Sequence, residues 1–238
     1  MLFMKTAPTP HKRRIAIPTE SKQTLAESVA NQLREEIISG QLAAGTMVAE
    51  IPTAERLGVS RVPVREATLV LERDGLLEFE GRGRCRVRTL TPIDLHEIYG
   101  VRLLLEMETF RLAARNHTPD DLKAMRDNID QLKRARSLSQ VTLLDIEFHD
   151  LVAVAARQSR LSHLWRIMRG QIQLFTAYLQ REVAQVRFAV REAAVSGHND
   201  CLSIIESRNE AAAEECAKSH LQLWDQWLRA SERTGNAL

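Results

Sequence analysis

Four side chains in the second half of the chain have the types and spacing of a metal site. Asp145 and His149 stand four residues apart, which places both on one face of a helix and within reach of a shared ion. His198 and His220 each precede apolar residues of a later helical pattern, so each lies near the apolar stripe of its own helix. A single histidine in such a place is usually a hydrogen-bonded core residue. Three histidines and a carboxylate on three helices predict a shared divalent ion instead.

Three imidazoles and one carboxylate suit Zn²⁺ or Ni²⁺ best, and Mn²⁺ or Fe²⁺ as well. These four ligands would leave one or two positions open on a five- or six-coordinate ion, where water or the carboxylate of a small molecule could bind. Such an ion could activate water for catalysis. The sequence offers no convincing general base, because Glu147 is two residues from both Asp145 and His149 and projects to another helix face.

Arg102 is a further candidate for binding chemistry. It follows Leu95 and Ile98 on their apolar face, and Glu106 stands four residues after it. A cation that faces a core needs a partner. Glu106 could be that partner in an i,i+4 ion pair, or Arg102 could hold the carboxylate of an organic-acid effector by two hydrogen bonds. Both interpretations stay open at this point.

Arg61 and Arg65 indicate a second kind of chemistry nearer the N-terminus. Residues 53–57 are predicted to form a short helix, Gly58 a sharp turn, and Ser60 the N-cap of a second helix. Both arginines then project from one face near the positive end of that helix, where a recognition helix meets base edges and phosphates. The residues predicted to contact DNA here are Ser60, Arg61, Val62, Pro63 and Arg65.

Two short alternating segments, 76–80 and 85–88, follow this helix and predict a β-hairpin. Its tip contains Arg82 and Gly83. A hairpin directly after a recognition helix is a wing, and these two residues are predicted to contact phosphate or the minor groove. The two arginines alone would also fit an ordinary solvated helix, whereas helix and hairpin together predict a winged helix-turn-helix.

Beyond residue 90 the pattern is that of amphipathic helices with short breaks, which predicts an all-α bundle. The six predicted helices span 92–116, 119–136, 140–158, 161–184, 186–208 and 210–232. The predicted parts of the chain are a flexible basic tail (1–22), a DNA-binding domain (23–90), an effector- and metal-binding helical domain (91–233) and a short tail (234–238). The predicted fold class is therefore mainly α, with a small β-hairpin wing.

The charge distribution agrees with this division. Residues 1–90 contain 14 Lys/Arg and 11 Asp/Glu, a charge of +3, whereas the remainder contains 19 and 20, a charge of −1. No run approaches the roughly 18 apolar residues of a membrane span, and the start lacks a signal-peptide core. The three cysteines, Cys85, Cys201 and Cys216, fit amphipathic patterns, which predicts reduced thiols in the cytoplasm rather than a disulfide.

Residues 24–90 resemble the winged helix of the GntR family of bacterial transcription regulators. The family pattern has a "Gly-x-Leu-x-x-Gly" turn, here residues 40–45, and "Gly-Val-Ser-Arg-x-Pro-Val-Arg-Glu-Ala", here residues 58–67 without a gap. An "Asp/Glu-Gly-Leu" follows, here residues 74–76. One position departs from the pattern: where relatives usually have a DNA-contacting arginine, this chain has Ile51. Binding could therefore be weaker, or the preferred operator could differ.

The second half resembles the FCD class of ligand-binding domains found in FadR-type regulators, in its six-helix, VanR-like branch. The resemblance implies a bundle around a small effector, often beside a metal ion. The class typically carries Asp-x-x-x-His and two further histidines, and Arg102 with Glu106 also resembles its pattern. Asp145, His149, His198 and His220 match the ligand positions one by one. Position 197 departs from the class pattern, because this chain has Gly197 where a glutamate usually stands.

These observations predict a homodimeric transcription regulator, in function a repressor, that binds a palindromic double-stranded DNA operator in the cytoplasm. A small organic or sugar acid beside the divalent metal would control it. A metalloenzyme and a regulator with a purely structural metal are the alternatives, although an enzyme would leave the winged helix unexplained.

Outside the site, His96, His117 and His163 are predicted at the surface or at helix ends. Trp165, Trp224 and Trp227 are predicted in the core or an interface.

Overall fold

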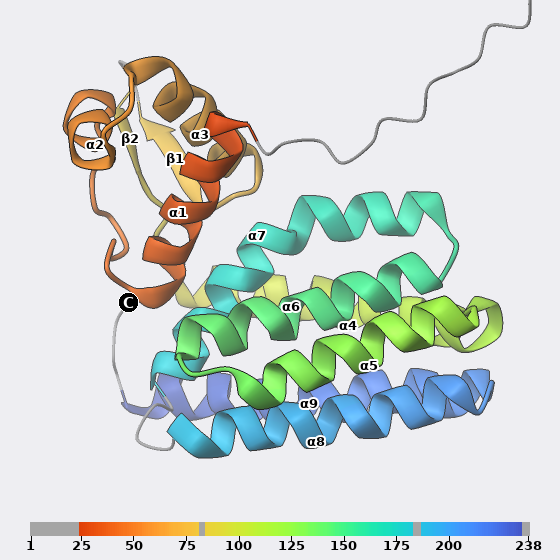
Figure 1. Ribbon diagram of the computed structural model, residues 1–238. Helices are drawn as coiled ribbons and strands as arrows, with labels where there is room; N and C mark the ends of the chain where they lie inside the picture. Colours follow the sequence, from red (N-terminus) through yellow and green to blue (C-terminus); the bar gives the residue numbers. More distant parts are fainter. Residues whose placement is uncertain (1–23, 81–83, 183–186, 235–238) are drawn as a thin grey trace, which may run out of the picture.

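The computed structural model describes residues 24–80, 84–182 and 187–234, drawn as ribbon in Figure 1. The N-terminal part consists of α1 (Leu25–Ser39), α2 (Glu50–Leu57), α3 (Arg61–Arg73), β1 (Leu77–Glu80) and β2 (Arg84–Val87). The described helices that follow are α4 (Pro92–Asn116), α5 (Pro119–Arg134), α6 (Leu138–Ala155), α7 (Ser159–Glu182), α8 (Arg187–Glu206) and α9 (Glu210–Thr234). The predicted fold class, a winged helix-turn-helix followed by an all-α bundle, is confirmed.

Three helices begin at capping boxes that the sequence encodes locally. In each box a threonine hydroxyl accepts a hydrogen bond from the backbone N–H three residues on, and the carboxylate at that position accepts one from the threonine N–H. The pairs are Thr24 with Glu27, Thr91 with Asp94 and Thr118 with Asp121. These contacts fix where α1, α4 and α5 begin.

The helix-turn-helix differs from its prediction in two details. Helix α2 begins at Glu50, before the predicted residue 53, because Pro52 lies in the first turn, where a missing N–H is not needed. Gly58 then ends α2 with a φ of 66°, a left-handed conformation that suits glycine. Ser60 stands at the N-cap of α3, but its side chain makes no capping hydrogen bond. Pro63, the third residue of α3, has no N–H to donate to it.

The wing is a two-stranded antiparallel hairpin. Leu77 pairs with Val87 at one end and Glu80 with Arg84 at the other. On the hairpin, Arg86 forms ion pairs of 2.7 Å with both Glu78 and Glu80. The predicted tip residues Arg82 and Gly83 lie outside the described residues.

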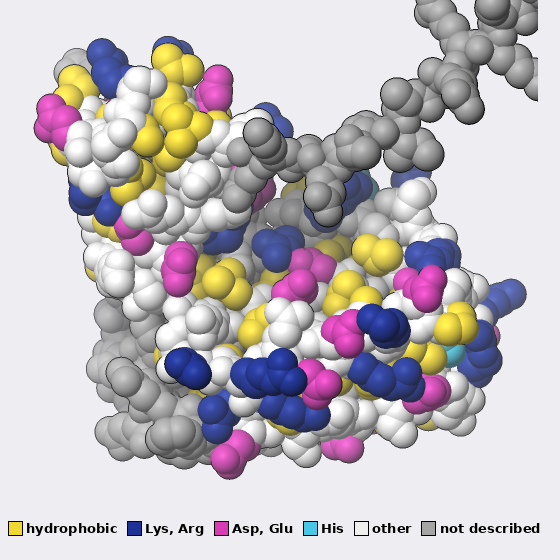
Figure 2. Space-filling view, in the orientation of Figure 1, with side chains coloured by type: hydrophobic (Ala, Val, Ile, Leu, Met, Phe, Trp, Pro, Cys, Tyr) yellow, Lys and Arg dark blue, Asp and Glu magenta, His cyan; other side chains and the backbone are white. Residues whose placement is uncertain are grey.

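The described helices of the bundle agree with the predicted bounds within three residues, and the predicted helix end at 184 and helix start at 186 lie outside the described residues. The largest difference is at the end of α6, which stops at Ala155 because Arg157 adopts a left-handed φ of 56°. Basic and acidic side chains are interspersed over the bundle face seen in Figure 2, and α5 carries local pairs of this kind, such as Lys123 with Asp127. Among the described residues, no helix has both the length and the apolar character needed to cross a bilayer.

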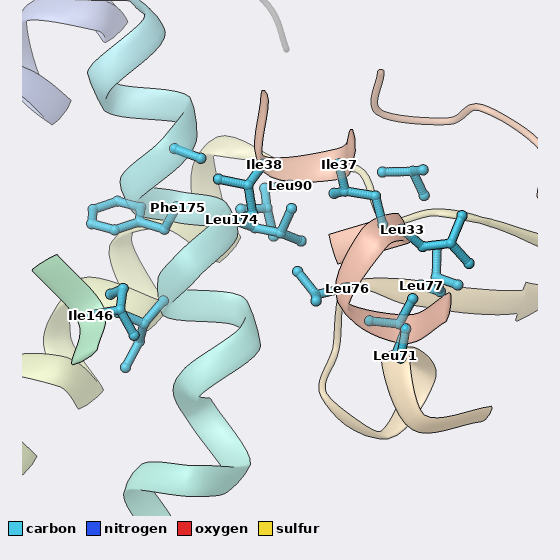
Figure 3. Packing of buried hydrophobic residues seen from close by; sticks show 14 of the residues in the cluster. Leu33, Ile37, Ile38, Leu71, Leu76, Leu77, Leu90, Ile146, Leu174 and Phe175 are labelled. Atoms are coloured by element: carbon cyan, nitrogen blue, oxygen red, sulfur yellow. The ribbon is translucent and has the colours of Figure 1, made fainter. Parts of the chain in front are cut away.

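The winged helix rests on one end of the bundle, next to α7 (Figure 1), and the two parts share a core. Figure 3 shows Leu174 of α7 beside Ile38 of α1 and Leu90 of the connection to α4. Backbones also meet closely here: a Cβ on Gly170 of α7 would lie 1.7 Å from the carbonyl oxygen of Asp74, at the end of α3. Helix α7 therefore touches the C-terminal end of α3.

Candidate metal and DNA-binding sites

The four predicted metal ligands lie together inside the bundle. Asp145 and His149 come from α6, His198 from α8 and His220 from α9, and one ligand atom of each lies within 4.8 Å of the others. Oδ1 of Asp145 is 3.3 Å from Nε2 of His198. Because metal–ligand bonds are about 2.1 Å long, the ligand atoms of a tetrahedral ion are about 3.4 Å apart. Side-chain adjustments that shorten the longest separations by up to about 1.4 Å would let one ion contact all four, so this group could hold a metal ion.

The three imidazoles form a triangle, and aromatic packing holds the His198 ring in place. The ring centroids of His149 and His198 are 5.4 Å apart, and both lie at similar distances, 5.3 and 5.2 Å, from that of His220. Phe148 stacks on His198 with a centroid separation of 4.0 Å and an interplanar angle of 9°. Since Phe148 is fully buried on α6, this contact fixes the plane of the His198 ring.

Burial and neighbouring groups shift the pKa of three of these side chains. Burial lowers the pKa of His220 to about 3, with help from His198 and His149. The pKa of His198 is also lowered by burial, although Asp145 opposes the change. For Asp145, burial raises the pKa but the contact with His198 outweighs it, so the net pKa is lowered. Neutral imidazoles and an ionised carboxylate are the forms that bind a metal.

Glu106 belongs to the site, a role that the sequence did not reveal beyond its pairing with Arg102. Its Oε1 accepts a hydrogen bond of 2.6 Å from Nε of Arg102, and its Oε2 lies 2.8 Å from Nδ1 of His149. Burial raises the pKa of Glu106, but Arg102 and His149 together lower it to about 2. An anionic oxygen beside Nδ1 favours the tautomer with the proton there, which leaves Nε2 of His149 for an ion.

Arg102 is fully buried, as its apolar face predicted, and it has several contacts in the bundle. Besides the pair with Glu106, its Nη1 donates to Oγ1 of Thr176 on α7 at 3.3 Å, and its Cζ lies 5.6 Å from the centroid of the Trp224 ring. Nη2 has no hydrogen-bond partner among the described residues. The ion pair with Glu106, one of the two interpretations of Arg102, is thus present in the structure. The Nη2 donor of Arg102 is left for a further partner.

Polar side chains of α7 line the same interior. Gln173, Thr176 and Gln180 are all buried, and Gln180 accepts a hydrogen bond from Thr142 of α6. Neither amide atom of Gln173 has a partner among the described residues. The sequence did not single out these residues, because isolated polar positions in an amphipathic helix usually face solvent.

Gly197, the position that departs from the FCD pattern, brings the backbone of α8 close to the ring of His220. A Cβ built on Gly197 would lie 2.9 Å from Nδ1 and 3.1 Å from Cε1 of His220. The imidazole of His220 therefore lies against the backbone of α8, and its Nε2 is buried without a partner among the described residues. A glycine at this position provides the space for the ring.

The remaining predicted histidines and tryptophans lie largely as expected. His96 and His163 are exposed, and His117 is the C-cap of α4, where it is buried with Nδ1 2.9 Å from the carbonyl oxygen of Ala113. Trp165 and Trp224 are buried in the core. The side chain of Trp227 lies outside the described part of the chain. Glu147 is exposed, on a different face of α6 from Asp145 and His149.

The start of α3 presents the predicted DNA-contacting residues with one exception. Ser60, Arg61, Val62 and Arg65 are exposed, whereas Pro63 is buried and shapes the first turn. Arg61 is 3.3 Å from Glu50 in an exposed pair, and such a pair is worth at most about 1 kcal/mol. The guanidinium therefore stays available to a stronger partner. Ile51 is 51% exposed on α2, so the residue that replaces the family's arginine also faces solvent.

Comparison with known proteins connects this architecture to a family. The model for "Bacterial regulatory proteins, gntR family" matches residues 25–87, and the model for the FCD domain matches residues 97–223, more than half of the chain. The gluconate operon transcriptional repressor of Bacillus subtilis (strain 168) is 26% identical over 194 residues, which are 80% of this chain and 79% of that protein. The probable D-xylose utilization operon transcriptional repressor of Paenarthrobacter nicotinovorans is 27% identical over 207 residues, 84% and 89% of the two chains.

A solved structure described as E. coli McbR/YncC shares the fold, with a TM-score of 0.72 and 22% identity over 88% of this chain and 99% of that one. The winged helix, the helical bundle and both family models agree on one assignment. The chain belongs to the GntR family of bacterial transcription regulators and carries an FCD domain.

Proposed function

We propose that this protein is an operator-binding repressor whose DNA affinity is controlled by a small organic acid or sugar acid, bound beside a divalent metal ion. The observation that carries the proposal is a group of buried polar atoms without partners among the described residues. They are Nη2 of Arg102, both amide atoms of Gln173, Oδ2 of Asp145, Nε2 of His149, Nδ1 of His198 and Nε2 of His220. In a bundle interior such atoms cost free energy unless an ion or ligand binds them.

Asp145, His149, His198 and His220 would hold the ion. Their donor set suits Zn²⁺ or Ni²⁺ best, with Mn²⁺ and Fe²⁺ as further candidates. When bound, the ion would supply positive charge and an open coordination position for an anion. Glu106 would keep the His149 tautomer that leaves Nε2 available, and these residues would then act as one preorganised unit.

The remaining donors define the class of effector. Nη2 of Arg102 is suited to a carboxylate oxygen, and the Gln173 amide offers one donor and one acceptor group to hydroxyls. Gln173 is one helical turn before Thr176, which contacts Arg102, so a hydroxylated carboxylic acid of a few carbons could use both. The names of two relatives support this class: one represses a gluconate operon, and the other is assigned to D-xylose utilization.

On the DNA side, the exposed start of α3 would read base edges in the major groove. Arg61 and Arg65 are the residues suited to guanine, and the wing residues Arg82 and Gly83 would contact the backbone or minor groove. A homodimer would place two such helices on a palindromic operator. Helix α4 offers a candidate dimer surface, because Ile93 and Leu104 on one of its faces are 70% and 72% exposed.

Helix α7 would connect the two functions. Its Thr176 contacts Arg102, and its Gly170, six residues earlier, lies against Asp74 at the end of α3. Six residues of helix span about 9 Å, so a shift of α7 on effector binding would reach the winged helix directly. The effector would thereby favour a spacing of the two winged helices that no longer fits the operator, which is a population shift between two arrangements.

The test combines elemental analysis, thermal shift and gel shift on the full-length protein. We expect wild type dialysed against trace zinc or nickel to retain metal, and small sugar acids to raise its melting temperature and weaken its operator binding. His149→Ala and His220→Ala should lose metal, stability and effector response together, whereas exposed His163→Ala should lose none of them. A purely structural metal predicts the loss of stability without any acid that changes DNA binding. Wild type without metal, and ligand variants that melt like it, would leave only a polar core cluster.

A further inference from the structure

Two thiols on neighbouring helices face each other beside the metal group. Cys201 of α8 and Cys216 of α9 have their Sγ atoms 2.9 Å apart, and both thiols are free. The two helices pack side by side in Figure 1, joined by a short connection at residues 207–209. Cys201 is 1% exposed, whereas Cys216 is partly exposed. Cys216 is thus the residue of the pair that solvent reaches, and Cys201 is the buried one.

We propose that Cys201 and Cys216 are a redox-active dithiol, which a hydroperoxide converts to a disulfide that joins α8 to α9. A disulfide has an S–S bond of about 2.05 Å, so the two sulfurs need to approach by only about 0.9 Å. The reduced thiols expected from the sequence are then one of two states of the pair.

The reaction takes place in two steps. The Cys216 thiolate attacks the hydroperoxide, so that an S–O bond forms, the O–O bond breaks and an alcohol leaves with the proton. The sulfur of Cys201 then attacks the resulting sulfenic acid, an S–S bond forms, the S–O bond breaks and water leaves. Two thiols are oxidised by two electrons in total, and one hydroperoxide is reduced to an alcohol and water.

The surroundings favour Cys216 as the attacking group and separate the pair from Cys85. A hydrogen bond with Cys201 lowers the pKa of Cys216, and the same contact, together with burial, raises the pKa of Cys201. In the wing, burial and the charge of Glu72 raise the pKa of Cys85 to about 11. Because the thiolate is the reactive form, Cys85 should be inert under conditions that oxidise Cys216.

The position of the pair gives the bond a consequence for the bundle. Cys201 follows His198 by three residues on α8, and Cys216 precedes His220 by four on α9. A disulfide would hold together the two helices that carry half of the metal group. That consequence rests on the proposed function, whereas the dithiol itself requires no metal.

The experiment therefore uses full-length protein stripped of metal by a chelator and treated with hydrogen peroxide. We expect wild type to lose about 2 Da, the mass of two hydrogens. Trypsin should release peptides 192–208 and 209–218 as one linked species. The melting temperature of the oxidised protein should rise and return to its starting value after reduction. The matched control Cys85→Ala should behave as wild type.

Variants of the pair separate the two steps. Cys216→Ser should show no mass loss, and Cys201→Ser should stop at a sulfenic acid on Cys216 that a dimedone reagent traps. The proposal is wrong if both thiols are still alkylated by iodoacetamide after peroxide treatment. It is equally wrong if Cys85→Ala abolishes the mass loss, or if the linked peptides come from two different chains. None of these readouts depends on whether the histidines bind an ion, so a failure here leaves the proposed function intact.

Discussion

Replacing Gly197 with alanine should change the stability of the protein in opposite directions without and with metal. The added methyl group would lie 2.9 Å from Nδ1 of His220, where ordinary contact begins at 3.4 Å, so the ring must move by about 0.5 Å. Without an ion the imidazole is the end of a side chain and can move. With an ion it is held between the α8 backbone and the metal.

The magnitudes follow from these two situations. In metal-free protein, alanine in a helix interior is better than glycine by about 0.5–1 kcal/mol, so Gly197→Ala should be slightly stabilised. With metal, a displacement of about 0.5 Å exceeds the tolerance of about 0.2 Å for a metal–ligand distance, and we expect 10- to 100-fold weaker binding. At a metal concentration of 100 times the wild-type Kd, the stabilisation by metal would fall from about 2.7 kcal/mol to between about 1.4 and 0.4 kcal/mol.

Thermal melts with and without zinc, and a competition titration against a fluorescent chelator, measure both effects. For a chain of this size about 1 kcal/mol corresponds to about 2–4 °C, so the changes are resolvable. Gly100→Ala is the matched control, because Gly100 lies within α4 and a Cβ there would meet nothing within 4 Å. It should gain helix stability and keep the full metal response. If Gly197→Ala binds zinc as tightly as Gly100→Ala, His220 does not hold the ion from the position described.

Three further substitutions test other parts of the molecule. Arg65→Ala should cost about 1–3 kcal/mol of specific operator binding in a gel-shift titration, and unchanged affinity would remove Arg65 from the reading surface. Arg82→Ala should weaken binding to all sequences alike and flatten the salt dependence by roughly one unit of slope; a constant slope would mean that the wing does not touch phosphate. Gly170→Ala would bring a methyl group to 1.7 Å from the backbone of Asp74, so the winged helix must separate from α7 at a cost of about 1–3 kcal/mol. A melt and a limited proteolysis pattern identical to wild type would contradict the shared interface.

The features that the sequence predicted are those set by local spacing. Helical periodicity and capping residues determine α4 to α9, and Asp145 with His149 share a face because they are four residues apart. The contact of Glu106 with His149 could not be predicted in this way, because it joins α4 to α6 and depends on how the two helices cross. The same holds for Gly197, whose role depends on the distance between α8 and α9.

The burial of individual side chains is a second feature that the sequence alone did not predict. Gln173 has the same sequence context as a solvent-exposed glutamine, and only the packing of α7 against the bundle shows that it is buried. Pro63 is the converse case: it belongs to a motif that resembles a DNA-contacting segment, but its side chain is buried. Tertiary packing decides both positions, and local propensity contains no information about it.

The charges of the buried cluster lead to a final prediction about the effector. Glu106 and Asp145 are ionised, Arg102 is a permanent cation in contact with Glu106, and the imidazoles of His198 and His220 are neutral. Without an ion these groups sum to −1, and with a divalent ion to +1. An acid of charge −1 would thus meet repulsion in metal-free protein and attraction in metal-loaded protein, a difference that the low dielectric of the interior enlarges.

A pair of ligands of the same shape isolates this effect. A sugar acid and the corresponding sugar alcohol differ mainly in the carboxylate, and gluconate with its alcohol is one such pair. We expect the acid to raise the melting temperature only of metal-loaded protein, and the alcohol to have little effect on either form. An acid that stabilises metal-stripped and metal-loaded protein equally would show that the carboxylate binds away from the four metal ligands. An alcohol as effective as the acid would show that the charge of the ion has no part in recognition, because a neutral ligand does not respond to a reversal from −1 to +1.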